Sequence, residues 1–477
     1  MIRRFVCLLV AALIILTFGG TALADNRPSL ATPAQTSAAT ALTVIVTGLF
    51  IAVCVMLAMR RPETGRENFW PLLLIAAVAA VTLRVFIAAV YPGYAIDMGC
   101  FRAWSLAVYE HGPSGFYASL NFADYPPGYM YVLWVTGFLR SIFGISDSSA
   151  AFTVLLKLPS IISEVIAAVF LYRIASHEAG KKFALLCSLL LLFNPAMFFN
   201  SSVWGQMDAV FTLFVVLTLY HLKKERYLAG AFFFAVSLLL KPQALLFLPV
   251  VGLAYFYALF KKGGLRKAVA GIFGGLAIIA AVIFLGSLPF QGNQPTFWII
   301  DRYASTVGSY PYATLNAFNL FALSGGNWAE ITKTFLIFDY KTWGMIFLVV
   351  ICAAIVFLQW RTRDTRPYFD LSAFLIISVF MLMHMVHERY IVPACVLLVF
   401  AYVYSRDTTT LVFAGAYSVS ALLNQLVTLY ADTTSAPEAP LLIFSAVNLA
   451  LYLVYAVVTI RKLSSGKVLI KSPALLG

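Results

Sequence analysis

Long apolar runs alternate with short polar segments along nearly the whole chain. A helix of about 17 to 25 apolar residues can cross a bilayer, whereas a membrane barrel would show alternating segments of about ten residues. The pattern therefore predicts an all-α polytopic membrane protein with about 13–14 transmembrane helices. The expected spans lie near residues 5–23, 40–59, 69–91, 150–174, 182–200, 204–222, 227–240, 242–260, 267–287, 343–360, 369–385, 390–404, 408–430 and 440–460.

One further apolar stretch, residues 127–144, decides the predicted topology. If it crosses the membrane, the basic loops 173–182 and 222–226 fall outside, against the preference of Lys and Arg for the cytoplasmic side. If it lies at the surface or re-enters, these loops fall inside, together with the basic segments 60–61, 261–262, 361–366 and 461–462. We therefore expect that it does not span, which places the polar motifs described below on the exterior face.

Composition agrees with a membrane protein. Of 477 residues, 62% are hydrophobic and only 11% are charged, more apolar surface than a soluble protein of this length can hide. The net charge of +13 does not indicate nucleic-acid binding, because the basic residues cluster in short loops between spans. The six cysteines are scattered and show neither a disulfide framework nor the spacing of a zinc site.

The N-terminus has two interpretations. Arg3 and Arg4 precede a short apolar stretch that ends in the small-residue sequence before Asp25. Residues 1–24 are either a signal peptide, which we favour, or a first transmembrane helix. Residues 25–38 are polar and rich in Ala, Thr and Pro, which predicts a flexible exposed segment.

Asp97 is the first carboxylate whose position calls for a structural or functional explanation, because it follows an apolar run at the expected membrane boundary. Pro92 and Gly99 predict that it lies on a loop before a short amphipathic helix, residues 101–109. Partial desolvation there suits a general base. The alternative is that its side chain caps the helix.

A second acidic signal is Asp124, which Tyr125, Pro126 and Pro127 follow. The two prolines predict an extended entry and a helix that begins at Pro127. Asp124 is then either a site residue or part of the start of that helix.

Two polar interruptions follow in the middle of the chain. The first is the sequence Trp204 to Asp208, either a binding site for a sugar or lipid headgroup or an interfacial turn in which Asp208 caps the next helix. The second is Lys241, followed by Pro242 and Gln243 inside an apolar run. It either binds a phosphate or extends to the interface.

A last polar group, His384 to Tyr390, follows an apolar span. His384 and His387 would share one face of a helix, but the sequence supplies no matching third metal ligand. Arg389 with His387 suits phosphate better, because the arginine fork matches phosphate oxygens. The aromatic exterior stretch 288–342 suits sugar rings or an interfacial belt, and no nucleotide-binding loop appears.

In this order, the motifs resemble the GT-C superfamily of integral-membrane glycosyltransferases. The narrower resemblance is to the bacterial group related to the second mannosyltransferase of GPI-anchor synthesis, and the chain is also similar to the dolichyl-phosphate-glucose-dependent glucosyltransferases. The motifs that carry it are Asp97 with Phe101 to Trp104, Asp124 to Pro127, Asn194-Pro195, Trp204 to Asp208, Lys241 to Gln243, Asn316 to Leu320 and His387 to Arg389. Two segments before residue 69 are extra, and Arg389 stands where the glucosyltransferases have lysine.

The resemblance implies a GT-C-type fold with juxtamembrane helices in the first large exterior loop. It implies inverting transfer of a hexose, mannose or glucose, from a polyprenyl-phosphate-sugar donor to an acceptor on the exterior face. Asp97 would be the general base, and Lys241, His387 and Arg389 would contact the donor phosphate. The full set expected to bind donor or substrate is Arg102, Asp124, Tyr125, Trp204, Gln206, Asp208, Lys241, Gln243, Asn316, Asn319, His384, His387, Glu388 and Arg389.

The same chemistry predicts the partners. A phosphate is a good leaving group that needs cations rather than a proton donor, so we expect no cofactor and regard a divalent metal as optional. The expected partners are the lipid donor, a glycan, lipid or protein acceptor, and the bilayer, without nucleic acid. The protein is expected in the cell membrane as a multi-pass protein of the cell envelope, with its active site on the extracytoplasmic face.

The resemblance also implies a division of the chain. After residues 1–24, we expect an exposed segment with an extra span at 25–68 and a catalytic transmembrane module at 69–290 that includes the exterior loop 92–127. A second exterior loop at 291–342 and C-terminal helices at 343–477 would follow. The main alternative function is a transporter or flippase of lipid-linked sugars, which predicts charged pairs near the midplane and an inverted repeat. The third hypothesis is a purely structural membrane scaffold.

Overall fold

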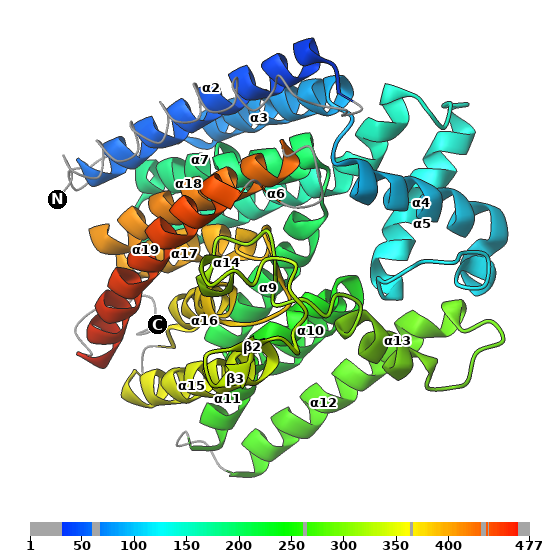
Figure 1. Cartoon of the computed structure of the whole chain (residues 1–477). Coiled ribbons are helices and arrows are strands. Elements are labelled where there is room, and N and C mark those ends of the chain that lie inside the picture. Colours follow the sequence, from blue (N-terminus) through cyan, green and yellow to red (C-terminus); the bar gives the residue numbers. More distant parts are fainter. Residues whose placement is uncertain are drawn as a thin grey trace. The chain divides into compact units, whose positions relative to one another are not determined.

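A computed structural model describes residues 31–59, 67–260, 265–362, 366–430, 436 and 438–465 (Figure 1). The signal peptide or first span expected in residues 1–24 lies outside these described residues. The basic pairs expected on the cytoplasmic side at 60–61 and 261–262 lie outside them as well.

The chain forms two compact units. Unit 1 comprises residues 1–91, 164–204 and 311–477, and unit 2 comprises residues 92–163 and 205–310. The chain passes between the units after Tyr91, within α6 (Ala150–Ala179), between Trp204 and Gly205, and after Tyr310.

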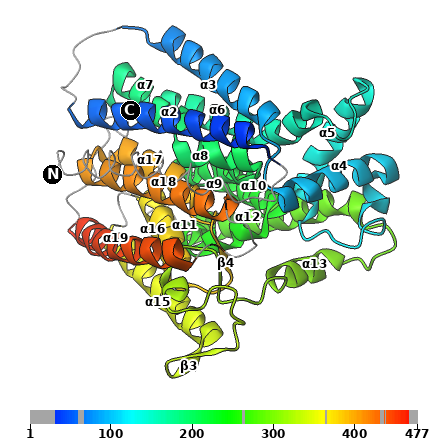
Figure 2. The same cartoon turned by 45° about the horizontal axis from the view of Figure 1, so that its top comes forward.

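Unit 1 is a bundle of helices with two very small sheets. Its elements besides part of α6 are α2 (Pro33–Ala58), α3 (Trp70–Val90), α7 (Lys181–Leu192), α8 (Pro195–Phe198), η1 (Phe199–Trp204), β1 (Thr314–Leu315), α14 (Leu320–Leu323), β2 (Thr334–Phe335), β3 (Phe338–Asp339), α15 (Tyr340–Arg361), α16 (Tyr368–Leu382), β4 (Val386–His387), α17 (Val392–Ser405), α18 (Thr408–Leu429) and α19 (Glu438–Ser464). Helices α2 and α3 lie side by side against α7 (Figures 1 and 2). Helices α16 and α17 are apolar on all sides and almost wholly buried, as expected for the centre of a bundle.

Unit 2 contains helices and loops, and its described residues form no strand. Its elements besides part of α6 are α4 (Ala95–Phe116), α5 (Pro127–Ile142), α9 (Asp208–Lys223), α10 (Tyr227–Leu240), η2 (Pro242–Phe247), α11 (Leu248–Phe260), α12 (Leu265–Ser287), η3 (Leu288–Phe290) and α13 (Trp298–Val307). Helix α10 packs against both α9 and α12, and α4 packs against α5. Gly137 permits the α4–α5 approach, because a Cβ there would lie 2.6 Å from the Ser105 carbonyl oxygen.

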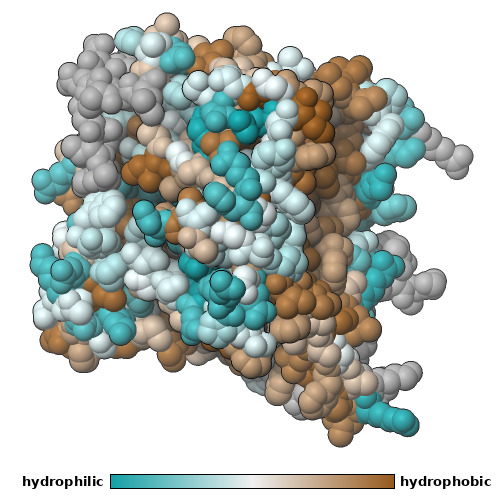
Figure 3. Space-filling model, turned by 90° about the vertical axis from the view of Figure 1, so that its right-hand side faces the viewer, coloured by the Kyte–Doolittle hydropathy of each residue, from teal (hydrophilic) through white to brown (hydrophobic). Residues whose placement is uncertain are grey.

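The helices confirm an all-α polytopic membrane protein. Among the described residues, eight helices are long and apolar enough to cross a membrane, and four shorter helices are also apolar. The predicted count of 13–14 also included residues 5–23, which are not described, and 204–222, where α9 begins only at Asp208. Helix α5, predicted not to span, is in neither group. Figure 3 shows apolar side chains gathered along one side of the surface and hydrophilic ones in its middle.

Two local predictions were wrong. The segment 25–38 was expected to be flexible and exposed; residues 25–30 lie outside the described residues, but α2 begins at Pro33. Thr32 and Gln35 form a capping box there, which satisfies the free N–H groups of the first turn. The helix expected at 101–109 is longer, since α4 runs from Ala95 to Phe116 and bends at Gly112, whose φ is 68°.

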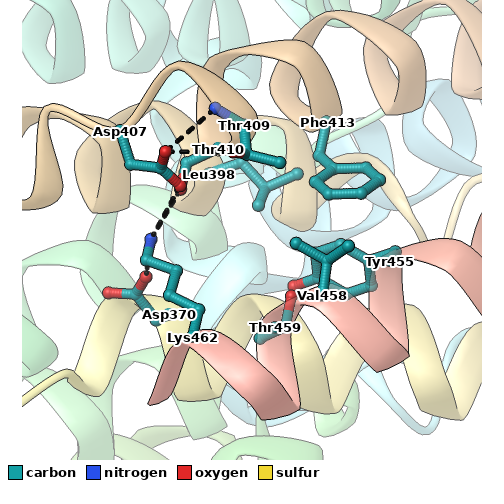
Figure 4. A pocket seen from close by; sticks show the side chains of 10 residues that line it. All are labelled: Asp370, Leu398, Asp407, Thr409, Thr410, Phe413, Tyr455, Val458, Thr459 and Lys462. Carbon is teal, nitrogen blue, oxygen red and sulfur yellow. Dashed lines mark hydrogen bonds and ion pairs between the residues drawn. The ribbon is translucent and has the colours of Figure 1, made fainter. Parts of the chain in front are cut away.

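One end of unit 1 is joined by a cation shared among three helices. Lys462 of α19 lies 3.2 Å from the Asp370 carboxylate and 3.6 Å from that of Asp407, and it donates to the Thr410 hydroxyl at 2.6 Å (Figure 4). Asp407 also accepts from the Thr409 backbone and so caps α18. Burial alone would raise the pKa of Asp407, but the Lys462 charge and the hydrogen bonds outweigh burial and hold this pKa below its usual value.

We predict that Asp407→Asn lowers the free energy of unfolding by about 1–2 kcal/mol at pH 7, because the amide keeps the cap but loses the Lys462 charge. A depressed carboxyl pKa stabilises the fold above about pH 4, and this contribution disappears as the pH falls through the native value. Melting temperatures of the two proteins should therefore differ at pH 7 and converge on acidification. A pH-independent difference would contradict the prediction.

Candidate functional site

The structure places Asp97 in the first turn of α4, where Tyr94 is the N-cap residue. Both earlier interpretations of its position, a loop residue or a side-chain cap, are therefore wrong. The helix begins earlier than expected, at Ala95, so Asp97 lies within the helix rather than in the loop before it. A carboxylate in the first turn is stabilised by the helix dipole. Asp97 is half-buried.

Asp97 and Asp124 lie around the same thiol, that of Cys100 on α4. Burial first, and then the charges of Asp97 and Asp124, together raise the pKa of Cys100 to about 11. Two carboxylates that act on one thiol lie in one neighbourhood of unit 2. We call Asp97 and Asp124 the acidic pair.

Side chains from neighbouring helices hold the loop that carries Asp124 through hydrogen bonds to its backbone. Four consecutive carbonyl oxygens, of residues 122–125, each accept a hydrogen bond from a side chain. The donors are Trp104 Nε1 to Phe122 (2.9 Å), Arg302 Nη1 to Ala123 (2.7 Å), Thr306 Oγ1 to Asp124 (2.5 Å) and Tyr117 Oη to Tyr125 (2.8 Å). The Arg302 guanidinium also lies over the Tyr117 ring at 4.4 Å. Helices α4 and α13 thus fix this loop. As predicted, α5 begins at Pro127, and its N-cap residue is Pro126 rather than Asp124.

The segment after Trp204 packs directly against α4. Gly205 has φ 95°, a conformation that glycine adopts without strain. A Cβ there would lie 2.3 Å from the Met98 sulfur, so this backbone touches the residue next to Asp97. Ser160 of α6 donates to the Gln206 carbonyl oxygen at 2.7 Å, which fixes the turn.

Asp208 and Lys241 form a buried ion pair. Asp208 is the first residue of α9 but makes no side-chain cap, since the N-cap residue is Met207. Lys241 ends α10 and lies 5.8 Å from the centre of the Tyr125 ring. The Tyr125 hydroxyl donates to Gln206 Oε1 at 3.5 Å. The structure thus gathers four predicted residues, Tyr125, Gln206, Asp208 and Lys241, in unit 2.

Lys241 does not lie at the surface, where a phosphate ligand or an interfacial lysine was expected, because its partner Asp208 lies in the interior of unit 2. Gln243 is also buried, in η2. Arg102 is half-buried. It donates to Thr153 Oγ1 at 3.0 Å and lies over the Phe152 ring at 5.2 Å, so it contacts the start of α6.

In unit 1, a short parallel ladder brings two distant motifs together. Strand β1 pairs with β4 so that Leu315 faces His387, and Asn316 forms a further bridge to His387. The prediction that His384 and His387 share a helix face is wrong. Helix α16 ends at Leu382, and Met385 has φ 60° and donates its N–H to the Tyr312 carbonyl oxygen at 3.1 Å. Pairing with β1 thus replaces the helix.

Arg389 is charge-balanced by its neighbour. It donates to Glu388 at 2.7 Å, and His387 Nδ1 lies 3.9 Å from the same carboxylate. The Arg389 guanidinium lies 5.9 Å from the centre of the Trp204 ring, which is fully buried. These four predicted residues therefore lie together in unit 1, and we call His387, Glu388 and Arg389 the basic triplet.

Asn316 and Asn319 carry much of the structure around β1. Asn316 has φ 58°, a left-handed conformation that Asn tolerates. Its side-chain oxygen accepts from Asn327 (3.1 Å), Trp328 (3.1 Å) and the Ala436 backbone (2.9 Å). Asn319 caps α14 and donates to Thr314 Oγ1 at 3.0 Å. These contacts give both residues a structural role, whereas donor binding stays a prediction.

His384 packs against helix α15. A Cβ on Gly344 would lie 2.2 Å from His384 Nδ1, so a glycine is required opposite the ring. Burial lowers the pKa of His384, and the charge of Lys341 lowers it further, whereas Asp339 opposes them. This shift favours the neutral form of His384.

Besides Asp370 of α16, sequence reasoning missed three buried charges on α3 and α6. Lys157 lies fully buried on α6, against Gly205. Arg84 of α3 donates to Glu164 of α6 at 2.6 Å, and both are buried. The signal was present, since charges inside apolar runs are uncommon and are functional by default.

Comparison with known proteins adds one match. Residues 124–288 match the family model of dolichyl-phosphate-mannose-protein mannosyltransferases. The matched stretch begins at Asp124 and includes Trp204, Asp208 and Lys241. A search of curated proteins finds no match. The family match and the helical architecture support a multi-pass membrane glycosyltransferase with a fold of the GT-C type.

We predict that Asp97→Asn and Asp124→Asn each speed alkylation of Cys100 by about two- to fivefold at pH 8.5, because removing a nearby negative charge lowers the thiol pKa and only the thiolate reacts. Mass spectrometry of the Cys100 peptide measures the rate. The exposed Asp301→Asn should leave it unchanged. An unchanged rate in Asp97→Asn would remove Asp97 from the neighbourhood of the thiol.

We also predict that Lys241→Met lowers the free energy of unfolding by about 3–5 kcal/mol, because it leaves Asp208 buried without its lysine. The double variant Asp208→Asn/Lys241→Met should recover much of this loss. Thermal unfolding of the purified protein in detergent measures both, with the exposed Lys333→Met as control. Equal stability of Lys241→Met and wild type would mean that the pair does not hold the fold.

Proposed function

We propose that this protein transfers a hexose, mannose or glucose, from a polyprenyl-phosphate-sugar donor to an acceptor at the extracytoplasmic face, with inversion. The observation that carries the proposal is the family match, which begins at one member of the acidic pair, Asp124. The other member, Asp97, acts on the same thiol. We assign Asp97 the role of general base.

The proposed reaction is a single displacement. The acceptor hydroxyl oxygen attacks the anomeric carbon while Asp97 accepts the hydroxyl proton. The bond from the anomeric carbon to the phosphate oxygen breaks, and its electrons leave with polyprenyl phosphate. Asp124 is proposed to orient the acceptor, since its loop is held by four side-chain donors.

The leaving phosphate needs nearby cations. Arg389 and His387 of the basic triplet are the proposed ligands, because arginine matches phosphate oxygens with a forked set of donors. Glu388 balances the Arg389 charge in the structure, so donor phosphate would compete with it. Lys241 is already paired with Asp208, and its proposed contribution is to shape the site. Metal independence stays a prediction.

The test is sugar transfer by the purified protein in lipid vesicles, with radiolabelled polyprenyl-phosphate mannose or glucose as donor and a membrane extract as acceptor. Loss of a general base typically lowers the rate by about 10²- to 10⁴-fold, so Asp97→Asn should lose transfer to this extent while it still binds donor. Asp301→Asn, an exposed carboxylate elsewhere in unit 2, should keep full activity. Full activity of Asp97→Asn would move the base to Asp124 or Asp208.

One observation favours the alternative of a lipid-linked-sugar transporter. Such a protein was expected to contain charged pairs near the midplane and an inverted repeat, and Arg84–Glu164 and Lys241–Asp208 are buried charged pairs. The same vesicles distinguish the two functions. Movement of labelled lipid across the bilayer without sugar transfer by wild type would establish transport and overturn the proposed enzyme.

A further inference from the structure

The hairpin β2–β3 ends in an unusual turn. The strands pair antiparallel with Phe335 opposite Phe338, so the turn consists only of Leu336 and Ile337. Each of these two side chains is 75% exposed, and Phe338 is 42% exposed. Leu336 has φ 58°.

Folding in water does not explain this turn. Two-residue hairpins favour Gly, Asn or Asp, because the turn needs positive φ. A leucine is strained in this conformation, because its Cβ approaches the following carbonyl oxygen. Two large apolar side chains exposed to water bring no compensating stability, and exposed apolar patches mark contact with a partner or with a membrane.

The tip is held rigidly at the start of α15. Trp343 Nε1 of α15 donates to the Phe335 carbonyl oxygen at 2.8 Å. The Phe335 ring stacks on Tyr340 at 5.4 Å, and Phe338 packs against Trp343 at 5.4 Å. The hairpin therefore projects at the end of α15 as a fixed feature (Figure 2).

The surface next to the tip indicates that the tip contacts lipid. Helix α15 is among the helices that can span a membrane. An apolar stripe runs along its exposed side with helical spacing, through Met345, Ile346, Val349, Val350, Val356, Phe357 and Trp360. This stripe begins within two turns of the hairpin, and lipid is what such a stripe contacts in a membrane protein. The tip continues this lipid-facing surface.

We propose that the tip, Leu336 to Phe338, is a membrane anchor that inserts into the bilayer interface beside the N-terminal end of α15. Apolar and aromatic side chains partition into this interface. The charged Lys333, Asp339 and Lys341 flank the tip in the sequence, as expected where an apolar insertion ends in the headgroups.

The anchor would set the depth of the segment that carries β1. The backbone between Pro311 and Ile331 is closed by the hydrogen bond from the Ile331 N–H to the Pro311 carbonyl oxygen (3.0 Å), and Tyr312 bridges to Glu330. Strand β1 begins at Thr314, two residues after Tyr312, and pairs with β4. The inference depends on no donor or acceptor, so it stands or falls independently of the proposed function.

The test uses the full-length protein with its six cysteines replaced, reconstituted in vesicles of phosphatidylcholine and phosphatidylglycerol. A nitroxide spin label is attached at Ile337→Cys, at Val349→Cys as the lipid-facing reference, and at Thr332→Cys as an exposed polar reference. Oxygen, which concentrates in lipid, and a water-soluble nickel complex compete to relax each label. We expect Ile337 to resemble Val349, with several-fold higher oxygen than nickel accessibility.

Two results would overturn the anchor. Nickel accessibility equal to that at Thr332 would place the tip in water, and protection from both relaxants would place it in a protein contact. A second measurement keeps all native cysteines. Leu336→Trp should add fluorescence that lipids with brominated chains quench, whereas Thr332→Trp should add fluorescence that they do not quench. Equal quenching at both positions would also reject the anchor.

Discussion

A fully buried stretch in which the regular α-helix breaks, residues 194–208, is the constraint on which the structure depends. Such backbone is tolerated inside a membrane protein only where the protein satisfies its polar groups. Asn194 caps α8 and donates to Ser418, and Asn200 donates to Gln425. The π-helical turn η1, a geometry common at functional sites, then delivers Trp204 to the contact with Arg389. Without these amides, this stretch would have no reason to leave the helix.

Hydrophobic periodicity located most elements, because burial in lipid or in the bundle depends on local sequence. The predicted span 227–240 coincides with α10, and Pro127 begins α5 as its fixed φ requires. The same reasoning placed His384 and His387 on one helix, and this was wrong. Their conformation depends on pairing with β1, some 70 residues away in sequence as Thr314 and Val386 show, and no local pattern encodes such pairing.

The candidate site could be predicted as a set of residues but not as a set of contacts. The sequence marked Lys241 and Asp208 separately, and only the structure reveals that each neutralises the other. The sequence marked neither Arg84 nor Glu164, which the apolar pattern concealed because both lie within long apolar spans. Buried charges require partners, yet a sequence does not state which partner each charge finds. For this reason we propose Arg389 rather than Lys241 as the ligand of the donor phosphate.

The two carboxylates of the acidic pair suit different roles. Asp97 lies on the first turn of a regular helix, whose dipole stabilises a negative charge. Asp124 lies on a loop in which Arg302 and Thr306 of α13 hold the backbone. A base must accept a proton as the bond forms, whereas an orienting group must keep its geometry throughout. The loop of Asp124, which hydrogen bonds hold in place, suits orientation of the acceptor. Asp97 is held by its helix. We therefore propose that Asp97 accepts the proton and that α13 contributes by fixing the loop of Asp124.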